Sequence, residues 1–316
     1  MYYVKNKIIS LLIIKILLIS NRYSFAQEFI PEWTLNSINK GRYFFYDSID
    51  KELFNYGPEG LFFFDNLNLP ILNKYVTSFT TIGSKYIAAT TDGVYIAEKD
   101  QLVWEKTFNE LCMSVFNYND TLILLEGHIN NSNNPGKLYY SINSGISWFE
   151  YNSNLPANSV IDFIELNNKL YGFGWTSFVT NDFLNWSQTG IYVQPIGISN
   201  SVLALNNKIL WSRSNGLFIS ENFGINWIQS TVGFSSNLIH YKDFYFVFSS
   251  PNLLYSKDLI NWEIVAPPFS SYFNSNSNRI YSLFEYEGRI LVATFSGELW
   301  ELKIKNNPTI IKSELY

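Results

Sequence analysis

Three arginines, Arg42, Arg213 and Arg279, have the side-chain chemistry best suited to recognising an anionic group. A guanidinium group is planar and can donate two parallel hydrogen bonds to one carboxylate. Such recognition requires the three side chains to converge, although they are far apart in the sequence. The elements that carry them therefore decide whether they can form a site.

Other kinds of chemistry have little support in the sequence. Cys112 is the single cysteine, so no disulfide can form within the chain, and with only His128 and His240 a structural zinc site is not expected. No Ser-His-Asp, P-loop or H-E-x-x-H pattern is present. We therefore predict no metal, no cofactor and no catalytic residue.

A short motif recurs along the chain. The pattern S-x-N-x-G-x-x-W occurs at 141–148 and 220–227, and a form one residue shorter, with Thr or Ser and then Asp, occurs at 180–186 and 256–262. The motif residues are Ser141, Asn143, Gly145, Trp148, Thr180, Asp182, Trp186, Ser220, Asn222, Gly224, Trp227, Ser256, Asp258 and Trp262.

Each motif follows a short apolar strand and has the composition of a turn. The Asn or Asp side chain can accept hydrogen bonds from turn amides, and Gly145 and Gly224 permit a positive φ. The Trp can cover the turn. Because the hydroxyl residues lie at positions 141, 180, 220 and 256, the period is near forty residues, which indicates a repeat architecture.

A hairpin precedes each motif, with tight turns at Asn119-Asp120, Asn167-Asn168, Asn206-Asn207 and Lys242-Asp243. Four antiparallel strands per forty residues predict an all-β fold, a seven-bladed β-propeller, with six blades as the alternative. The expected blades are 42–73, 75–107, 112–151, 159–189, 198–230, 236–265 and 280–316. The spare segment 32–36 could pair with the last blade and close the ring.

The motif resembles the Asp-box, or BNR repeat, of sialidase-like propellers, a group that also includes sortilin-type receptors and photosystem-assembly propellers. The resemblance implies the propeller fold and a structural role for the box residues. It does not specify a function, because Asp-boxes occur in proteins with many roles. Both full-length boxes have Asn where the family has Asp.

Sialidases of this family also carry an R-I-P stretch, three arginines around the substrate carboxylate, a Tyr–Glu nucleophile pair and an Asp acid. No R-I-P is present, and Arg42 in GRYFF is the nearest match. The expected strand order puts Arg42, Arg213 and Arg279 on one face, but three of four arginines can share a face by chance. Fold similarity alone does not transfer chemistry.

The same face would carry the loops that hold Asp92, His128 and Trp175. Loops on a rigid scaffold often bind ligands, and an exposed Trp suits a sugar or a peptide. The alternatives are a solvated histidine and a tryptophan that packs within a blade. These three residues and the three arginines are our speculative binding set.

The N-terminus has the pattern of a secretory signal peptide. Lys5 and Lys7 precede the apolar run IISLLIIKILLIS (8–20), and Ser24-Phe25-Ala26 resembles a cleavage site. An uncleaved anchor is the alternative. Removal of 1–26 would leave 18 Lys and Arg against 27 Asp and Glu in a single propeller domain, 27–316.

The resulting charge of −9 argues against nucleic acid, and against membrane beyond the export signal. We therefore expect a secreted or periplasmic protein without a lipid-anchor cysteine. Its expected function is that of a non-catalytic binding or scaffold module for a glycan or protein ligand. A diverged sialidase-type glycoside hydrolase is the alternative, and the oligomeric state is left open.

Overall fold

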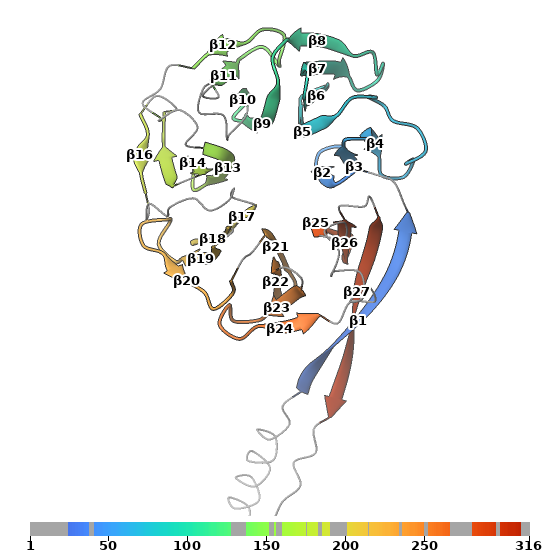
Figure 1. Ribbon diagram of the computed structural model, residues 1–316, viewed down its shortest axis with the longest axis vertical. Coiled ribbons are helices and arrows are strands. Elements are labelled where there is room, and N and C mark those ends of the chain that lie inside the picture. Colours follow the sequence, from blue (N-terminus) through green and yellow to red (C-terminus); the bar gives the residue numbers. More distant parts are fainter. Residues whose placement is uncertain are drawn as a thin grey trace, which may run out of the picture.

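The computed structural model describes residues 25–37, 41–127, 137–151, 155, 160–174, 176–182, 185–189, 201–213, 215–233, 236–249, 252–265, 280–294 and 298–310. Every helix or strand that it assigns to these residues is a β-strand. The strands form seven antiparallel sheets arranged around a ring (Figure 1), which confirms the seven-bladed β-propeller. His128, Trp175 and Arg279 lie outside the described residues.

Each blade is a meander whose first strand is nearest the ring centre and whose last strand is at the rim (Figure 1). Blade one contains β2 (Tyr43–Asp47), β3 (Glu52–Gly57) and β4 (Gly60–Phe63), and blade two contains β5 (Val76–Ile82), β6 (Lys85–Thr90), β7 (Gly93–Glu98) and β8 (Glu105–Phe108). Blade three contains β9 (Cys112–Tyr118), β10 (Thr121–Glu126), β11 (Leu138–Ser141) and β12 (Phe149–Glu150).

Blade four contains β13 (Val160–Leu166), β14 (Lys169–Gly174), β15 (Ser177–Thr180) and β16 (Ser187–Gln188), and blade five contains β17 (Ser201–Leu205), β18 (Lys208–Arg213), β19 (Gly216–Ser220) and β20 (Ile228–Gln229). Blade six contains β21 (Ser236–Tyr241), β22 (Phe244–Ser249), β23 (Asn252–Ser256) and β24 (Glu263–Val265). Blade seven contains β25 (Ile280–Tyr286), β26 (Arg289–Thr294), β27 (Leu299–Ile310) and the N-terminal strand β1 (Phe25–Ser37).

The ring closes as the sequence predicts. β1 pairs antiparallel with β27, with Trp33 opposite Leu302 and Leu35 opposite Trp300. Closure between blades seven and one also uses aromatic contacts, because the Phe44 ring lies 5.9 Å from that of Phe284. β1 therefore fills the fourth position of blade seven, which would otherwise be an exposed sheet edge.

Blade one departs from the expected four strands. Its described residues form three strands, and the fourth position is reduced to a bridge between Leu61 and Leu72. The amide of Ile71 donates to the carbonyl of Leu61 at 2.8 Å. Pro70, next to this bridge, has no amide proton for a further ladder bond, which is consistent with the short pairing.

The hydrophobic core lies between blades. Each buried cluster joins residues of two neighbouring blades, as Leu210 and Leu217 of blade five join Val247 of blade six. Alternation along each strand turns β-branched and aromatic side chains to both faces of a blade, so each blade packs on two neighbours. Buried clusters of this kind join the blades in succession from blade one to blade seven.

The hydroxyl of each repeated motif, here called a box, is the centre of its turn. Ser220 is fully buried; its hydroxyl donates to Asn222 Oδ1 at 3.1 Å and accepts from the amide of Gly224 at 2.8 Å. Ser141 makes the corresponding bonds in blade three, at 2.9 Å each. Each of these two serine hydroxyls therefore both donates and accepts within its own turn.

The shorter boxes have a different turn geometry. In the long form two consecutive residues have positive φ, Phe223 and Gly224 in blade five. In the blade-six box only Leu259 has a positive φ, and its amide donates to the Ser256 hydroxyl at 2.9 Å. Asp258 Oδ1 then accepts from the amides of Ile260 and Asn261. One fewer left-handed residue explains why the short form needs no glycine.

The box tryptophans join neighbouring blades. Trp148 of blade three packs beside Phe108 of blade two and donates to Thr107 Oγ1 at 3.2 Å. Trp262 of blade six donates to Ser230 Oγ, which follows the outer strand of blade five. Trp104 of blade two, which has no box, likewise donates to the Ile71 carbonyl of blade one.

Candidate functional site

The two faces of the ring differ. On one face, here called the turn face, strands are joined by the tight hairpin turns and by the box turns. On the other, here called the loop face, the inner strands begin and the second strands end. Four long connections between successive strands, 127–137, 151–159, 189–200 and 266–279, join strand ends of the loop face, whereas the connection 64–75 runs from the turn-face end of β4 to the loop-face start of β5.

Arg42 lies at the loop face, immediately before β2. Its amide donates to the Tyr56 carbonyl at 2.8 Å, and its carbonyl accepts from Ser282 Oγ of blade seven at 2.7 Å. Asn55 is buried, and its Nδ2 donates to the carbonyls of Gly41 and Tyr43. These bonds fix the backbone from which the half-buried Arg42 side chain projects.

Arg213 ends β18 at the same face, but its side chain is buried, with 2% of the residue exposed. The guanidinium lies over the Trp211 ring, 4.2 Å from its centroid. Burial lowers the pKa of Arg213 to about 10. β2 and β18 lie on opposite sides of the ring centre (Figure 1), so convergence of the three arginines on one carboxylate stays a prediction.

Asp92 is held by its own neighbours. It accepts from Thr90 Oγ1 at 2.7 Å, from Lys74 Nζ at 2.9 Å and from the Tyr95 hydroxyl at 3.1 Å. Burial raises its pKa, but these hydrogen bonds outweigh burial and lower the pKa of Asp92 to about 2. The carboxylate therefore organises the β6–β7 connection.

Asp162 was not among the residues that the sequence singled out. It lies on β13, the inner strand of blade four, beside a register shift in the pairing with β14. Phe163 N donates to its Oδ1 at 2.9 Å. Burial, opposed by this hydrogen bond, raises the pKa of Asp162 to about 6.

The charge of Asp162 acts on an aromatic residue of another blade. Burial and then the negative charge of Asp162 raise the pKa of Tyr56, which lies on β3 of blade one. The Tyr56 ring stacks on Tyr43, with centroids 5.4 Å apart. Arg42, Tyr43, Tyr56 and Asp162 therefore all lie near the loop-face ends of strands in blades one and four.

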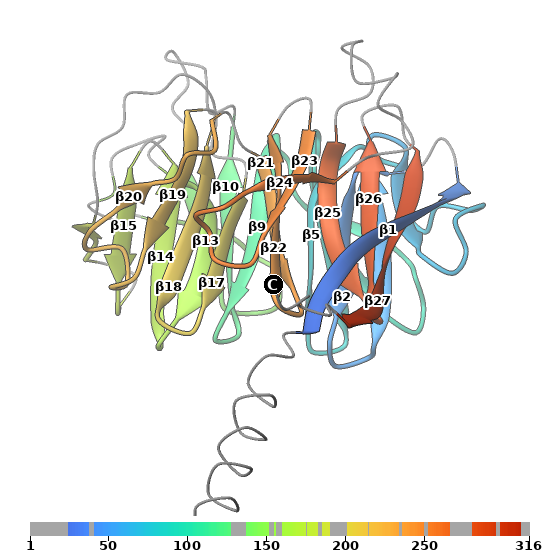
Figure 2. The ribbon, with the colours of Figure 1, turned by 90° about the horizontal axis from the view of Figure 1, so that it is seen from below.

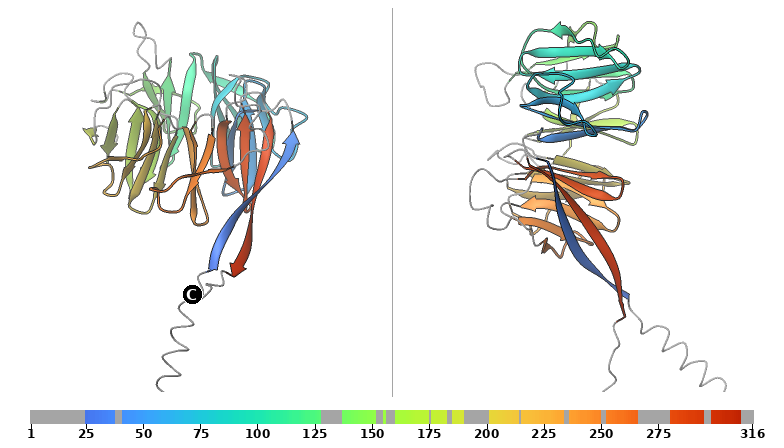
Figure 3. Two further views of the ribbon diagram at one scale, coloured as in Figure 1. Left: turned by 60° about the horizontal axis from the view of Figure 1, so that its bottom comes forward. Right: turned by 90° about the vertical axis from the view of Figure 1, so that its right-hand side faces the viewer.

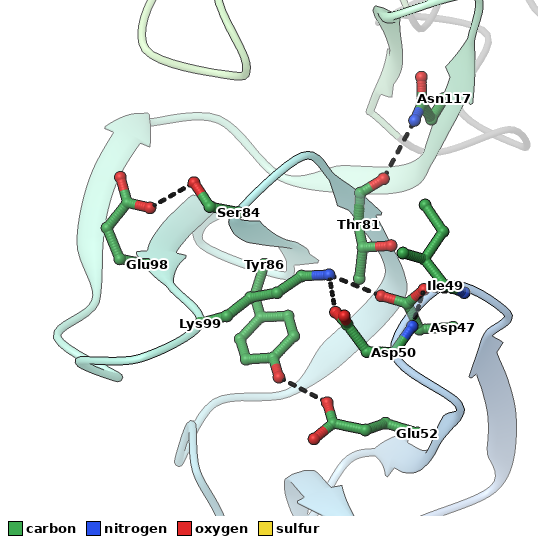
Figure 4. Close-up of polar contacts among 10 residues, drawn as sticks. All are labelled: Asp47, Ile49, Asp50, Glu52, Thr81, Ser84, Tyr86, Glu98, Lys99 and Asn117. Carbon is green, nitrogen blue, oxygen red and sulfur yellow. Dashed lines mark hydrogen bonds and ion pairs between the residues drawn. The ribbon is translucent and has the colours of Figure 1, made fainter.

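A polar cluster at the turn face joins blades one and two (Figure 4). Lys99 Nζ donates to Asp47 Oδ2 at 2.7 Å and is ion-paired with Asp50, and Tyr86 donates to Glu52 Oε2 at 2.7 Å. Burial raises the pKa of Asp47, but its hydrogen bonds, chiefly from Lys99, lower it overall. The Lys99 ammonium group therefore already neutralises the Asp47 and Asp50 carboxylates.

The described residues contain no group of three or more His, Cys, Asp and Glu residues arranged to hold a metal ion. None of the described residues forms a helix with the length and apolarity needed to cross a membrane.

No protein-family model and no curated protein matches the chain by sequence. Solved structures match its fold. The extracellular domain of the one-component system BT4673 from B. thetaiotaomicron is 15% identical, with a TM-score of 0.66; the match covers 90% of this chain and 40% of that one. The chain therefore spans less than half the length of that structure.

Two enzymes give similar matches. A catalytically inactive variant of virginiamycin B lyase from Staphylococcus aureus is 9% identical with a TM-score of 0.66, over 87% of this chain and 99% of the lyase. The GH74 enzyme of Niastella koreensis is 12% identical with a TM-score of 0.57, over 87% of this chain and 43% of the enzyme. At these identities the likeness shows the propeller fold alone.

Proposed function

We propose that this chain is an exported, non-catalytic β-propeller that binds a glycan or protein ligand at its loop face. The observation that carries the proposal is the stacked pair of Tyr43 and Tyr56, whose second ring is under the influence of the Asp162 charge from another blade. Arg42, which precedes Tyr43 at the same face, is the cation that we assign to the site. Aromatic faces stack on sugars or apolar side chains, and the charged groups select hydroxyl, amide or ionic groups.

The contrast between the faces supports the same assignment. Polar groups of the Asp-boxes and of the Lys99 cluster are used within the turn face. At the loop face, a rigid frame holds the ends of long connections, as in other propellers and barrels that bind ligands. Extracellular domains and a glycoside hydrolase among the matching structures are compatible with this role.

Most glycosidases use two carboxyl groups roughly 5–10 Å apart. The site that we propose includes one carboxyl group, that of Asp162, so we favour binding over hydrolysis. The alternative, a diverged sialidase-type hydrolase, would require Arg42, Arg213 and Arg279 to converge. We also propose that the chain belongs to the Asp-box propellers, on the strength of the four boxes, and that segment 1–26 directs its export.

The test is binding of residues 27–316 to a glycan array, with turnover of sialosides and neutral glycosides measured on the same protein. We expect binding without turnover. Tyr56→Phe and Asp162→Asn should each weaken binding at least tenfold, and Ile264→Ser, an exposed change on outer strand β24, should not. Binding that survives both Tyr56→Phe and Asp162→Asn would contradict the assigned site.

A further inference from the structure

The turn face carries exposed aliphatic side chains at the tips of its turns. They come from blades one, two, three, five and six, and their exposure ranges from 59% at Ile146 to 80% at Ile49. The residues are Ile49, Val103, Ile142, Ile146, Ile225 and Ile260. Single exposed aliphatic residues are ordinary, but a set that recurs on one face of a repeat has a common structural origin.

Three of these residues occupy the same place in the Asp-box. Ile146, Ile225 and Ile260 each stand two residues before the box tryptophan. The box hydroxyl and carboxyl or amide hold the turn from within, and the tryptophan packs between blades, so this position projects to solvent. The fold neither buries these isoleucines nor needs them for the turn.

Several charges on the same face are ion-paired. Lys99 pairs with Asp47 and Asp50, Lys208 with Glu221 at 2.8 Å, and Arg289 with Glu301 at 3.1 Å. Asp100, Asp120 and Asp243 are exposed at other turns of this face, so the aliphatic tips stand among ion pairs, amides and exposed carboxylates.

The strand that closes the ring also connects this face with the N-terminal segment. β26 pairs with β27 only as far as Leu302, whereas β1 continues to pair with β27 to Ile310. Residues 25–32 and 303–310 therefore form a two-stranded ribbon beyond the blade. Figures 2 and 3 show the ribbon running outward from the ring and slanting away from the loop face.

The segment that precedes the ribbon has the composition of a chain that binds anionic lipid. Residues 1–24 include the apolar run 8–20, four basic residues and no Asp or Glu. The basic residues are Lys5, Lys7, Lys15 and Arg22. Stable attachment of this kind generally needs two signals, an inserted apolar group and a second contact.

We infer that the turn face lies against a lipid bilayer, with segment 1–24 retained as the tether and the aliphatic turn tips as the second contact. This departs from the composition-based expectation of no membrane contact beyond the export signal. It goes beyond the proposed function, because it leaves the loop face pointing away from the lipid and free to bind a ligand.

A bilayer suits this surface better than a protein partner does. Specific protein interfaces bury roughly 1,200–2,000 Å² in a continuous, shape-matched patch. Here the aliphatic side chains are single and distributed over five blades. A fluid, nearly flat lipid surface can contact separate tips at once without matching the polar groups between them.

The test uses the full chain in vesicles of phosphatidylethanolamine and phosphatidylglycerol. An environment-sensitive fluorophore is attached at Ile225→Cys, or at Ile264→Cys on the outer strand as the matched control. Both positions are exposed and the native Cys112 is fully buried, so labelling is selective. We expect a blue shift and quenching by brominated lipid at position 225, and neither at position 264.

Equal responses at the two positions would overturn the inference. A shift at position 225 that appears without lipid and grows with protein concentration would indicate contact with a second copy instead. The second readout is the mass of the protein extracted from bacterial membranes. The inference predicts the mass of a chain that keeps residues 1–24. The mass of a chain beginning at Gln27 would contradict the proposed tether. Glycan binding by residues 27–316 is independent of every outcome.

Discussion

Replacement of Asp162 by asparagine should stabilise the protein while weakening ligand binding. The carboxyl has a pKa of about 6 in the folded chain, against 3.8 for an unperturbed aspartate. The folded state therefore holds this proton more tightly than the unfolded state does, and ionisation at pH 7 opposes folding. One pKa unit corresponds to about 1.4 kcal/mol, so the cost at pH 7 is at most about 3 kcal/mol.

An asparagine side chain is neutral and similar in size, and it can still accept from Phe163 N through its oxygen. Asp162→Asn should therefore raise the free energy of unfolding in urea by about 1–3 kcal/mol at pH 7. The gain should shrink as the pH falls from 6 to 4, because the wild-type carboxyl then becomes protonated and stops opposing the fold. Asp243→Asn, an exposed turn residue of blade six, is the matched control and should change stability little.

The explanation fails if Asp162→Asn is less stable than the wild type at pH 7, or if its gain does not depend on pH. The first result would mean that the ionised carboxylate has a favourable partner in the folded state. A gain in stability together with a loss of binding would mark Asp162 as a residue kept for function at a cost to the fold.

Three further predictions concern the scaffold. Ser220→Ala removes a fully buried hydroxyl and leaves the Gly224 amide without its acceptor, so urea unfolding should show a loss of about 2–3 kcal/mol. Ser220→Thr should be close to wild type, because Thr180 holds the same place in blade four; an equal loss in both variants would refute the hydroxyl's role. Lys99→Met leaves the buried Asp47 without its cation and should cost about 3–5 kcal/mol at pH 7. Because the pKa of Asp47 is lowered, this difference should be present at neutral pH and disappear as the pH falls below about 4, as melting curves at several pH values would show. Cys112 should not react with a thiol reagent until the protein unfolds, since it is buried and burial raises its pKa; rapid native-state labelling would contradict this.

The repeat could be predicted from the sequence because each box motif is local. Its hydroxyl, amide or carboxyl and glycine lie within five residues, and the hairpin turns lie within two. The positive φ at Asn119, Asp120, Asn167 and Asn168 confirms the turns predicted there. Segment 32–36 could be assigned to the last blade because an unpaired edge needed a strand.

Contacts between blades could not be read in the same way. The sequence does not show that Trp148 packs on the preceding blade, that Lys99 reaches Asp47, or that Asp162 acts on Tyr56, because each pair joins different blades. Asp162 was also missed because it lies within a strand, whereas the search concentrated on loops. An acidic residue in the otherwise largely apolar inner strand VIDFIEL was the available signal.

Arg213 shows a second limit of sequence reasoning. Its position at a strand end predicts exposure at the loop face, but the side chain turns inward over Trp211. The two residues are separated by one position, so they project from the same face of β18, and the flat guanidinium can stack on the indole. This packing was not evident from the position of Arg213 alone.

The central claim is that the loop face binds a ligand without catalysis. The most direct measurement is turnover of a fluorogenic sialoside, beside a panel of neutral glycosides, by purified residues 27–316 whose all-β fold is verified by circular dichroism. We predict no turnover of any substrate. Sialoside turnover that is lost in Arg42→Ala would contradict the claim and would identify the arginines of the loop face as part of a catalytic site.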